Sequence, residues 1–222
     1  YKLLTKKKQK KMATQLGSRL VFKNSKAAIN RAGLSPASAV LSQSFLRFEV
    51  ELDTSKTNYT FDTLVNENTN PNFVTQNKLN LQDAFVVSEI GFFWADTIDT
   101  TASNYAMYSF NDQSIWTGND AWGIYNGTMT LNVNQRTILT GWDLDRHYNA
   151  PQYQQNPSGK GVNELALDSY GFYPAEPNIV LVGSKKNILQ VVLPQALQSV
   201  PKGARLICIF RGILAQNVTP VN

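Results

Sequence analysis

Alternation of apolar and polar residues sets in at Phe45 and recurs along the rest of the chain. In the segment FLRFEVEL, Leu46, Phe48 and Val50 alternate with charged residues. A period of two places the apolar side chains on one face, which predicts a half-buried β-strand. Eight further runs are rich in Val, Ile, Phe, Tyr and Thr, as strands are: YTFDTLV, AFVVSEIGFFWA, YAMYSF, TMTLNV, TILTGW, NIVLVG, NILQVVLP and ARLICIFRGILA.

Turn-forming sequences separate these runs, among them NTNPN, TGND, YNG, NPSGKG, AEPN, GSKKN and VPKG. No long amphipathic pattern follows residue 45, so the sequence supplies no crossover helices for a parallel sheet. We therefore predict an all-β domain over residues 45–222, an antiparallel β-sandwich wired as a single jelly roll. The polar segment 143–162, rich in Pro, Gly and Gln, is expected to form a large surface loop.

The first 44 residues have a different pattern. Met12, Leu16 and Leu20 recur every four residues among lysines, which would make a short basic amphipathic helix. Such a helix is marginal alone, because nucleation is costly and the lysines repel one another. The segment NRAGLSPASAVLSQS then has the Ala, Ser, Gly and Pro content of a flexible connector. We predict that residues 1–44 are a basic N-terminal arm and linker.

Charge is distributed very unevenly along the chain. Residues 1–48 contain 11 of the 21 Lys and Arg residues and no acidic residue, whereas the remainder holds 10 basic and 16 acidic residues. A basic tail on an acidic body is typical of a segment that binds a polyanion. Nucleic-acid phosphates and anionic lipid headgroups are both suitable partners, and a solubilising tail is the simpler alternative. The absence of acids favours a polyanion, with nucleic acid ahead of lipid. The residues expected to make this contact are Lys6, Lys7, Lys8, Lys10 and Lys11, supported by Arg19, Lys23 and Lys26.

The segment GWDLDRHY contains the strongest candidate for a metal or acid–base cluster. Asp143, Asp145 and His147 alternate, so on a strand they would share one face. However, His147 is the only histidine, and metal sites need three or four well-placed ligands. A charged strand end with Arg146 pairing nearby is the simpler interpretation, and we predict no metal site.

Other catalytic signals are weak. Glu49 and Glu51 share a strand face, and such paired carboxylates serve glycosidic chemistry, but they also fit the wet face of an amphipathic strand. The chain contains no G-x-S-x-G, P-loop, dinucleotide glycine fingerprint or H-E-x-x-H. Cys208 is the only cysteine and lies in the apolar run RLICIF, which excludes a disulfide framework or a zinc site. We expect no enzymatic activity, no cofactor and no small-molecule substrate.

Aromatic residues suggest a second class of function. Trp94, Trp116, Trp122 and Trp142, together with nine tyrosines, could line a sugar-binding face. Aromatic residues in this number also fill a sandwich core or a subunit interface. The alternative function is therefore a non-catalytic carbohydrate-binding or phage-fibre module.

Nothing in the chain predicts a membrane span or a secretory signal. The best apolar stretch, ARLICIFRGILA, is interrupted by Arg205 and Arg211 and is too short to cross a bilayer. The N-terminal segment lacks an apolar signal core. A single buried cysteine is compatible with assembly inside a cell.

The layout as a whole resembles jelly-roll capsid proteins of small icosahedral viruses and tailless bacteriophages. The resemblance lies in the lysine-rich, acid-free arm, the Ala/Ser/Pro linker and the single β-sandwich, and in segments such as EPNIVLVGSKKNILQVVLP, LQDAFVVSEIGFFW and KGARLICIFRGILA. It implies a subunit that self-assembles into a shell with its other copies and other virion proteins. The arm would contact packaged nucleic acid or the inner shell surface, and assembly would take place in the host cytoplasm.

One feature departs from this resemblance. Many such arms are richer in arginine, whereas lysine dominates here. Lysine acts as a point charge and does not form the bidentate fork that arginine offers to phosphate. Sequence-specific recognition of a packaging signal is therefore less expected than non-specific neutralisation.

Overall fold

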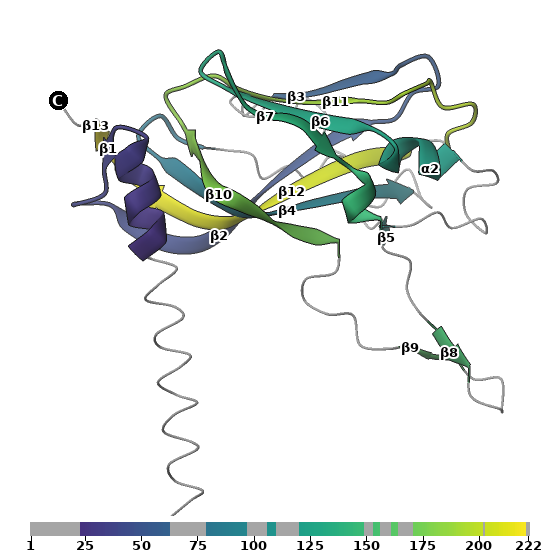
Figure 1. Cartoon of the computed structure of the whole chain (residues 1–222), viewed down its shortest axis with the longest axis horizontal. Coiled ribbons are helices and arrows are strands. Elements are labelled where there is room, and N and C mark those ends of the chain that lie inside the picture. The colour runs from purple at the N-terminus through teal and green to yellow at the C-terminus, as the bar shows by residue number, and fades with distance from the viewer. Residues whose placement is uncertain are drawn as a thin grey trace, which may run out of the picture.

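The structure, a computed structural model, describes residues 23–62, 79–96, 106–109, 120–148, 153–155, 161–163, 171–201 and 203–220. Two antiparallel sheets pack face to face (Figure 1). The first sheet has the order β10 (Phe172–Val182), β4 (Ala84–Asp96), β12 (Arg205–Gln216) and β2 (Val40–Glu51), and β5 (Ala106–Tyr108) pairs with β4. The second sheet has the order β3 (Asn58–Asp62), β11 (Asn187–Val192), β6 (Thr128–Val133) and β7 (Arg136–Asp143). The prediction of an all-β antiparallel sandwich is confirmed.

The remaining elements are short. Strand β1 (Leu34–Ser35) pairs with β13 (Thr219–Pro220), and β8 (Tyr153–Gln155) pairs with β9 (Gly161–Asn163). Helix α2 (Asp120–Tyr125) lies beside the second sheet, the 3₁₀ helix η1 (Asp145–His147) contacts α2, β4 and β10, and a further helix covers residues 23–31. No helix in the described segments is long and apolar enough to cross a membrane.

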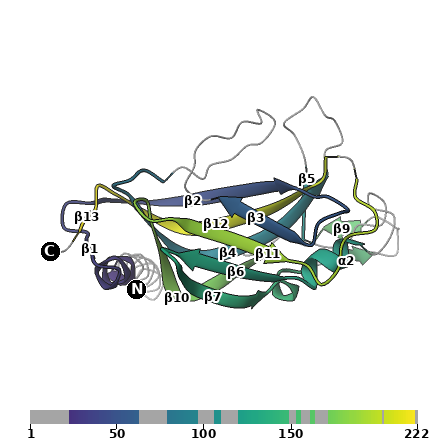
Figure 2. The ribbon, with the colours of Figure 1, turned by 90° about the horizontal axis from the view of Figure 1, so that it is seen from above.

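The eight long strands pair in a nested order along the chain. The innermost pair is β6 with β7, and successive pairs outward are β4 with β10, β3 with β11, and β2 with β12. Two of these pairs lie in each sheet, and the contacts β4–β12 and β6–β11 join them. The chain is thus a long antiparallel hairpin of four strand pairs, folded over so that its pairs alternate between the two sheets (Figure 2).

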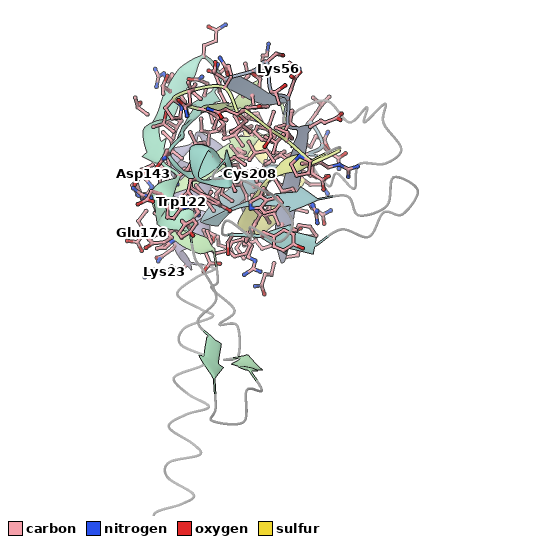
Figure 3. The ribbon with its side chains drawn as sticks, turned by 90° about the vertical axis from the view of Figure 1, so that its right-hand side faces the viewer. Lys23, Lys56, Trp122, Asp143, Glu176 and Cys208 are labelled. Atoms are coloured by element: carbon pink, nitrogen blue, oxygen red, sulfur yellow. The ribbon has the colours of Figure 1, made fainter. Side chains whose placement is uncertain are left out.

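The space between the sheets holds the main core. Phe48 on β2 and Phe210 on β12 meet edge to face with ring centroids 5.3 Å apart, and Trp94 stacks on Tyr108 at 4.6 Å. Cys208 lies in the same layer, fully buried, and this burial raises the pKa of its thiol (Figure 3). The lone cysteine is thus a core residue with a protonated side chain.

The outer face of the first sheet is apolar as well. Ala84, Val86 and Ile213 point away from the main core and form a second cluster with Ala28 and Ile29 of the helix at residues 23–31. Ile29 has no exposed surface. The helix therefore packs across the outer face of the first sheet, near β4 and β12 (Figures 1 and 2).

This packing corrects the expected boundary between linker and domain. Residues 30–44 do not form a flexible connector: Gly33, in a left-handed conformation with φ of 79°, ends the helix, β1 follows, and β2 already begins at Val40. A helix with few apolar positions gives little signal on its own, because its stability comes from the sheet that it covers. The folded domain thus begins at least as early as residue 23.

Strand β10 also differs from the prediction. The run NIVLVG predicted a strand from residue 178, but β10 begins at Phe172. Pro174 and Pro177 in its first half are unfavourable for a strand and prevented its recognition from the sequence. The register of β10 with β4 shifts between Pro174 and Ile179. Proline is tolerated here because β10 is an edge strand.

We expect Ile29→Ala to destabilise the folded protein by about 3 kcal/mol, because it leaves a cavity beneath the helix. Thermal or urea unfolding monitored by circular dichroism measures this change. Lys26→Ala, on the exposed side of the same helix, is the matched control and should change stability by less than about 0.5 kcal/mol. Equal, small effects of both substitutions would show that the helix does not contribute to the fold.

Candidate interaction surfaces

The basic residues expected to bind a polyanion fall into two groups. Lys6, Lys7, Lys8, Lys10, Lys11 and Arg19 lie outside the described residues. Lys23 and Lys26 lie on the helix at residues 23–31, and both side chains are exposed. Among the described residues, no carboxylate lies within ion-pair distance of either lysine.

These lysines are exposed to solvent because the buried residues of the helix lie on its other side. Ser25, Ala28 and Ile29 face the sheet, so the i, i+3 pair Lys23 and Lys26 faces solvent. The basic segment is therefore attached to the outer face of the first sheet through a packed helix. The orientation of the helix relative to the sandwich is set by this packing from residue 23 onward.

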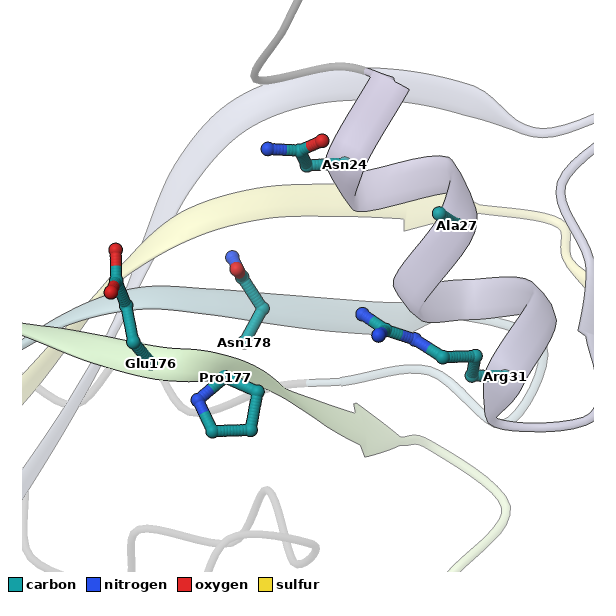
Figure 4. A pocket seen from close by; sticks show the side chains of 6 residues that line it. All are labelled: Asn24, Ala27, Arg31, Glu176, Pro177 and Asn178. Carbon is teal, nitrogen blue, oxygen red and sulfur yellow. The ribbon is translucent and has the colours of Figure 1, made fainter.

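A polar cavity of about 540 Å³ lies beside this helix (Figure 4). Asn24, Ala27 and Arg31 line it from the helix, and Glu176, Pro177 and Asn178 line it from β10. One positive and one negative side chain therefore reach the same cavity from opposite walls, with two amides between them (Figure 4). The lining can accept and donate hydrogen bonds, but it brings together no nucleophile and base.

Glu49 does not lie on a wet strand face, contrary to the sequence-based interpretation. Its carboxylate is fully buried between two arginines: Arg47 Nε lies 2.6 Å from Oε1, and Arg205 Nη1 lies 3.4 Å from Oε2. Glu51, by contrast, is exposed. The two carboxylates therefore do not form a catalytic pair, and Glu49 instead links β2 to β12 through charge-assisted bonds.

The cluster Asp143, Asp145 and His147 is not formed either. Strand β7 ends at Asp143 and the chain turns into η1, so the alternation of a strand does not continue. Asp143 and Asp145 are exposed and His147 is buried (Figure 3 labels Asp143). The described residues contain no group of three or more His, Cys, Asp or Glu side chains that could hold a metal ion.

His147 has a structural environment. Trp142 Nε1 donates to His147 Nε2 at 2.9 Å, so the ring proton sits on Nδ1, which donates to the carbonyl of Gly171 at 3.0 Å. Burial, together with nearby Arg146, lowers the pKa of His147 to about 4. The neutral ring therefore ties η1 to β7 and to the start of β10.

The tryptophans separate into core and surface residues. Trp94 is buried, and Trp116 lies outside the described residues. Trp122 on α2 is 39% exposed and stacks on Tyr148 with centroids 4.1 Å apart. Trp142 is partly covered by the guanidinium of Arg146, 4.2 Å above its ring. The sugar-binding interpretation thus rests on Trp122, which offers an aromatic face at the surface (Figure 3).

Several large apolar side chains outside this aromatic group are exposed. Over the described residues they are Val40, Phe45, Leu81, Met107, Ile138, Tyr173 and Val192, in addition to Trp122. Val40 and Phe45 belong to one strand, β2, which pairs with a single neighbour among the described strands. Val40 lies on the face of β2 that carries Leu46 and Phe48, and Phe45 lies on the opposite face, beside Arg47. Sequence alternation alone could not identify these two as exposed, because it does not show which parts of each face other elements cover.

Comparison of the chain with protein-family models, with curated proteins and with solved structures finds no match.

We expect Glu49→Gln to destabilise the protein by about 3 kcal/mol, because the substitution leaves two largely buried arginines without their counter-charge. Glu51→Gln on the same strand face is the control and should change stability by less than about 0.5 kcal/mol. Chemical unfolding of both variants measures the difference. If Glu49→Gln leaves the free energy of unfolding unchanged, the ion pairs of Glu49 with Arg47 and Arg205 do not stabilise the fold.

The protein should lose stability as the pH falls from about 6.5 to about 4, because the unfolded chain binds a proton at His147 that the folded protein excludes. The loss attributable to this residue is about 3 kcal/mol. His147→Gln preserves an acceptor and a donor but does not titrate. Urea unfolding at several pH values should therefore give a smaller slope for this variant than for the wild type, and identical slopes would contradict the prediction.

Proposed function

We propose that this protein is a virion structural protein, a capsid subunit whose copies assemble into a closed shell. The nested pairing of its eight long strands in two sheets carries the proposal, and it supports the assignment of the sandwich as a single jelly roll. Jelly rolls occur in viral capsid proteins and in lectin domains. Jelly rolls also occur in other proteins and a fold does not fix a function, so the choice of the capsid class rests on the charge layout.

The charge layout favours the capsid class. Residues 1–31 hold 10 basic residues and no acidic residue, and they precede a body with 11 basic and 16 acidic residues. A lectin has no need of such a segment, whereas a shell that encloses nucleic acid must offset phosphate charge. In this proposal Lys6, Lys7, Lys8, Lys10, Lys11 and Arg19 contact packaged nucleic acid or the inner shell surface, and Lys23 and Lys26 extend that contact.

The docked helix gives the segment a defined origin. Because the helix at residues 23–31 packs on the outer face of the first sheet, the basic residues before it start from that side of the sandwich. A charged segment attached to one face concentrates positive charge on one side of an assembled layer. This arrangement suits a wall with a nucleic-acid side and an opposite side formed by the second sheet.

The alternative is a carbohydrate-binding or phage-fibre module. Its support is the ring of Trp122, which is 39% exposed and stacks on Tyr148. Tryptophan quenching by a panel of soluble glycans tests this alternative. Quenching that Trp122→Ala abolishes, in a protein that stays monomeric, would favour the module over the shell.

Electron microscopy of the purified full-length chain should show closed particles at low salt in the presence of nucleic acid. Replacing Lys6, Lys7, Lys8, Lys10 and Lys11 together by Gln should weaken nucleic-acid binding and lower the slope of log K against log salt by about 3 to 4 units, about 0.7 per phosphate contact. Fluorescence titration with single-stranded DNA and RNA at several salt concentrations measures the slope. The Lys56→Gln variant, on the opposite end of the sandwich, is a single-charge control that should leave the slope unchanged.

A chain that remains monomeric under all these conditions would overturn the shell proposal. Nucleic-acid binding with an unchanged salt slope in the five-lysine variant would remove the role of the basic segment. Binding to anionic vesicles but not to nucleic acid would reassign the segment to a lipid surface.

A further inference from the structure

The two sheets have four edges, and three of them carry features that hinder pairing with another strand. Strand β10 contains Pro174 and Pro177 and an irregular register with β4. Strand β7 has two register shifts against β6 and a left-handed Gly141. Strand β3 is only five residues long. Prolines, bulges and short strands are the usual means by which proteins protect sheet edges.

The fourth edge, β2, lacks these features. It runs over 12 residues in unbroken register with β12. Its first half, residues 40–46 (VLSQSFL), contains no proline, glycine or charged residue. Over the described residues, no strand pairs with its outer edge. A long, regular and uncharged edge is a template for a further strand.

The side chains on this half of β2 are also exposed in a manner that suits an interface. Val40 is 60% exposed and Phe45 is 43% exposed, and Ser42 and Gln43 between them are exposed too. Apolar and neutral polar side chains without charges are characteristic of the buried centre of interfaces. The backbone edge and the exposed side chains of Val40, Ser42, Gln43 and Phe45 are therefore available for a partner.

We propose that a second copy of this chain pairs its β2 with this β2 in antiparallel orientation. The two-fold axis that relates the copies lies between their two Gln43 residues, which face each other directly. The proposal deepens the proposed function, since it rests on copies of the chain meeting in a shell and names one of the contacts. The two first sheets would join into one continuous sheet across the axis. Such an interface is isologous, because the same strand is used on both sides.

Geometry limits the possible registers. Directly opposed residues in an antiparallel pair point to the same side of the sheet, so the two-fold axis must lie between one residue and the same residue of the second copy directly opposite. With the axis at Gln43, the numbers of opposed residues add up to 86. The candidates next to it place the axis at Ser42 or at Ser44.

Side-chain matching selects the axis at Gln43. Phe45 then lies opposite Leu41 of the second copy, and Val40 lies opposite Leu46 of the second copy. An axis at Ser42 would instead place Val40 opposite Ser44, and an axis at Ser44 would place Phe45 opposite Gln43. Of these three registers, the one centred on Gln43 gives both exposed apolar side chains an apolar residue directly opposite, which is the pairing that stabilises sheets.

The same register avoids charge repulsion. The first charged residue of β2, Arg47, lies opposite Ala39 of the second copy, and Gln43 meets its own equivalent at the axis. The paired segment 40–46 spans about 24 Å and allows about seven backbone hydrogen bonds. A neutral edge of this length thus fits itself, whereas an edge with several charges would oppose like with like.

Charge substitution at the axis tests the proposal. Gln43→Lys places two lysines opposite each other, and Gln43→Glu places two glutamates opposite each other, so each variant alone should weaken pairing at least about tenfold. A one-to-one mixture of the two variants should restore pairing. Sedimentation velocity at low salt measures the association, and unchanged circular dichroism verifies folding. Thr140→Lys and Thr140→Glu on β7 are matched edge controls and should have no effect.

Cysteine pairs test the register inside assembled particles. Gln43→Cys should form an intermolecular disulfide on mild oxidation, because its sulfurs meet at the axis, and the buried native Cys208 does not compete. Ser42→Cys and Ser44→Cys should crosslink when mixed and only weakly alone, since residue 42 lies opposite residue 44. Non-reducing gels measure the dimer.

The outcomes separate this proposal from the function. Closed particles without a Gln43→Cys disulfide, and with no loss in the Gln43→Lys variant, would overturn the β2 pairing and leave the shell proposal standing. A β2-linked dimer that never forms larger particles would support the pairing and overturn the shell. A disulfide between two Ser42→Cys copies stronger than that of Gln43→Cys would overturn the register.

Discussion

The fold depends on the burial of β12 on both of its faces. Leu206, Cys208 and Phe210 point into the space between the sheets, whereas Ile207 and Ile209 point to the outer face of the first sheet. The strand is held in this position by β4 on one side and β2 on the other. Because side chains alternate with a period of two, a slip of one residue would exchange the two faces.

Strand β12 and its neighbour β4 do not pair in one continuous register. The register between β12 and β4 shifts at Arg211 and Gly212, and a Cβ atom at Gly212 would lie 1.9 Å from the carbonyl oxygen of Val86. The backbones therefore approach too closely for any side chain. Beyond this point Ile213 and Ala215 continue on the outer face, where the helix at residues 23–31 covers them. The register shift and the helix thus both contribute to the burial of β12 on its two faces.

The sequence alone predicted the parts of the fold in which local pattern and tertiary role agree. Alternation identified the strand around Phe48, and the apolar run around Phe210 identified β12, which is buried on both faces. It failed where a tertiary partner overrides the local signal. The helix at residues 23–31 is stabilised by the sheet beneath it, and Gly33, its stop signal, was attributed to a connector. The start of β10 was hidden by prolines that only an edge strand accepts.

The candidate surfaces were less predictable, because they depend on which way a side chain faces. Glu49 was expected in water and is enclosed by arginines from two strands, a pairing that joins residues 156 positions apart. His147 was expected beside two aspartates, but the chain leaves the strand conformation at Asp143 and turns the imidazole inward. The electrostatic argument for residues 1–48 needed no geometry. The neutral edge of β2, in contrast, is recognisable only when the strand order is known.

The position of Cys208 has an experimental consequence. Its sulfur lies in the layer between the sheets, where burial keeps it protonated, so thiol reagents have no access to it in the closed sandwich. The rate at which a thiol reagent modifies the chain therefore reports how often the two layers come apart. This modification rate can be measured without adding a label. It can therefore be compared between free subunits and subunits embedded in a larger assembly.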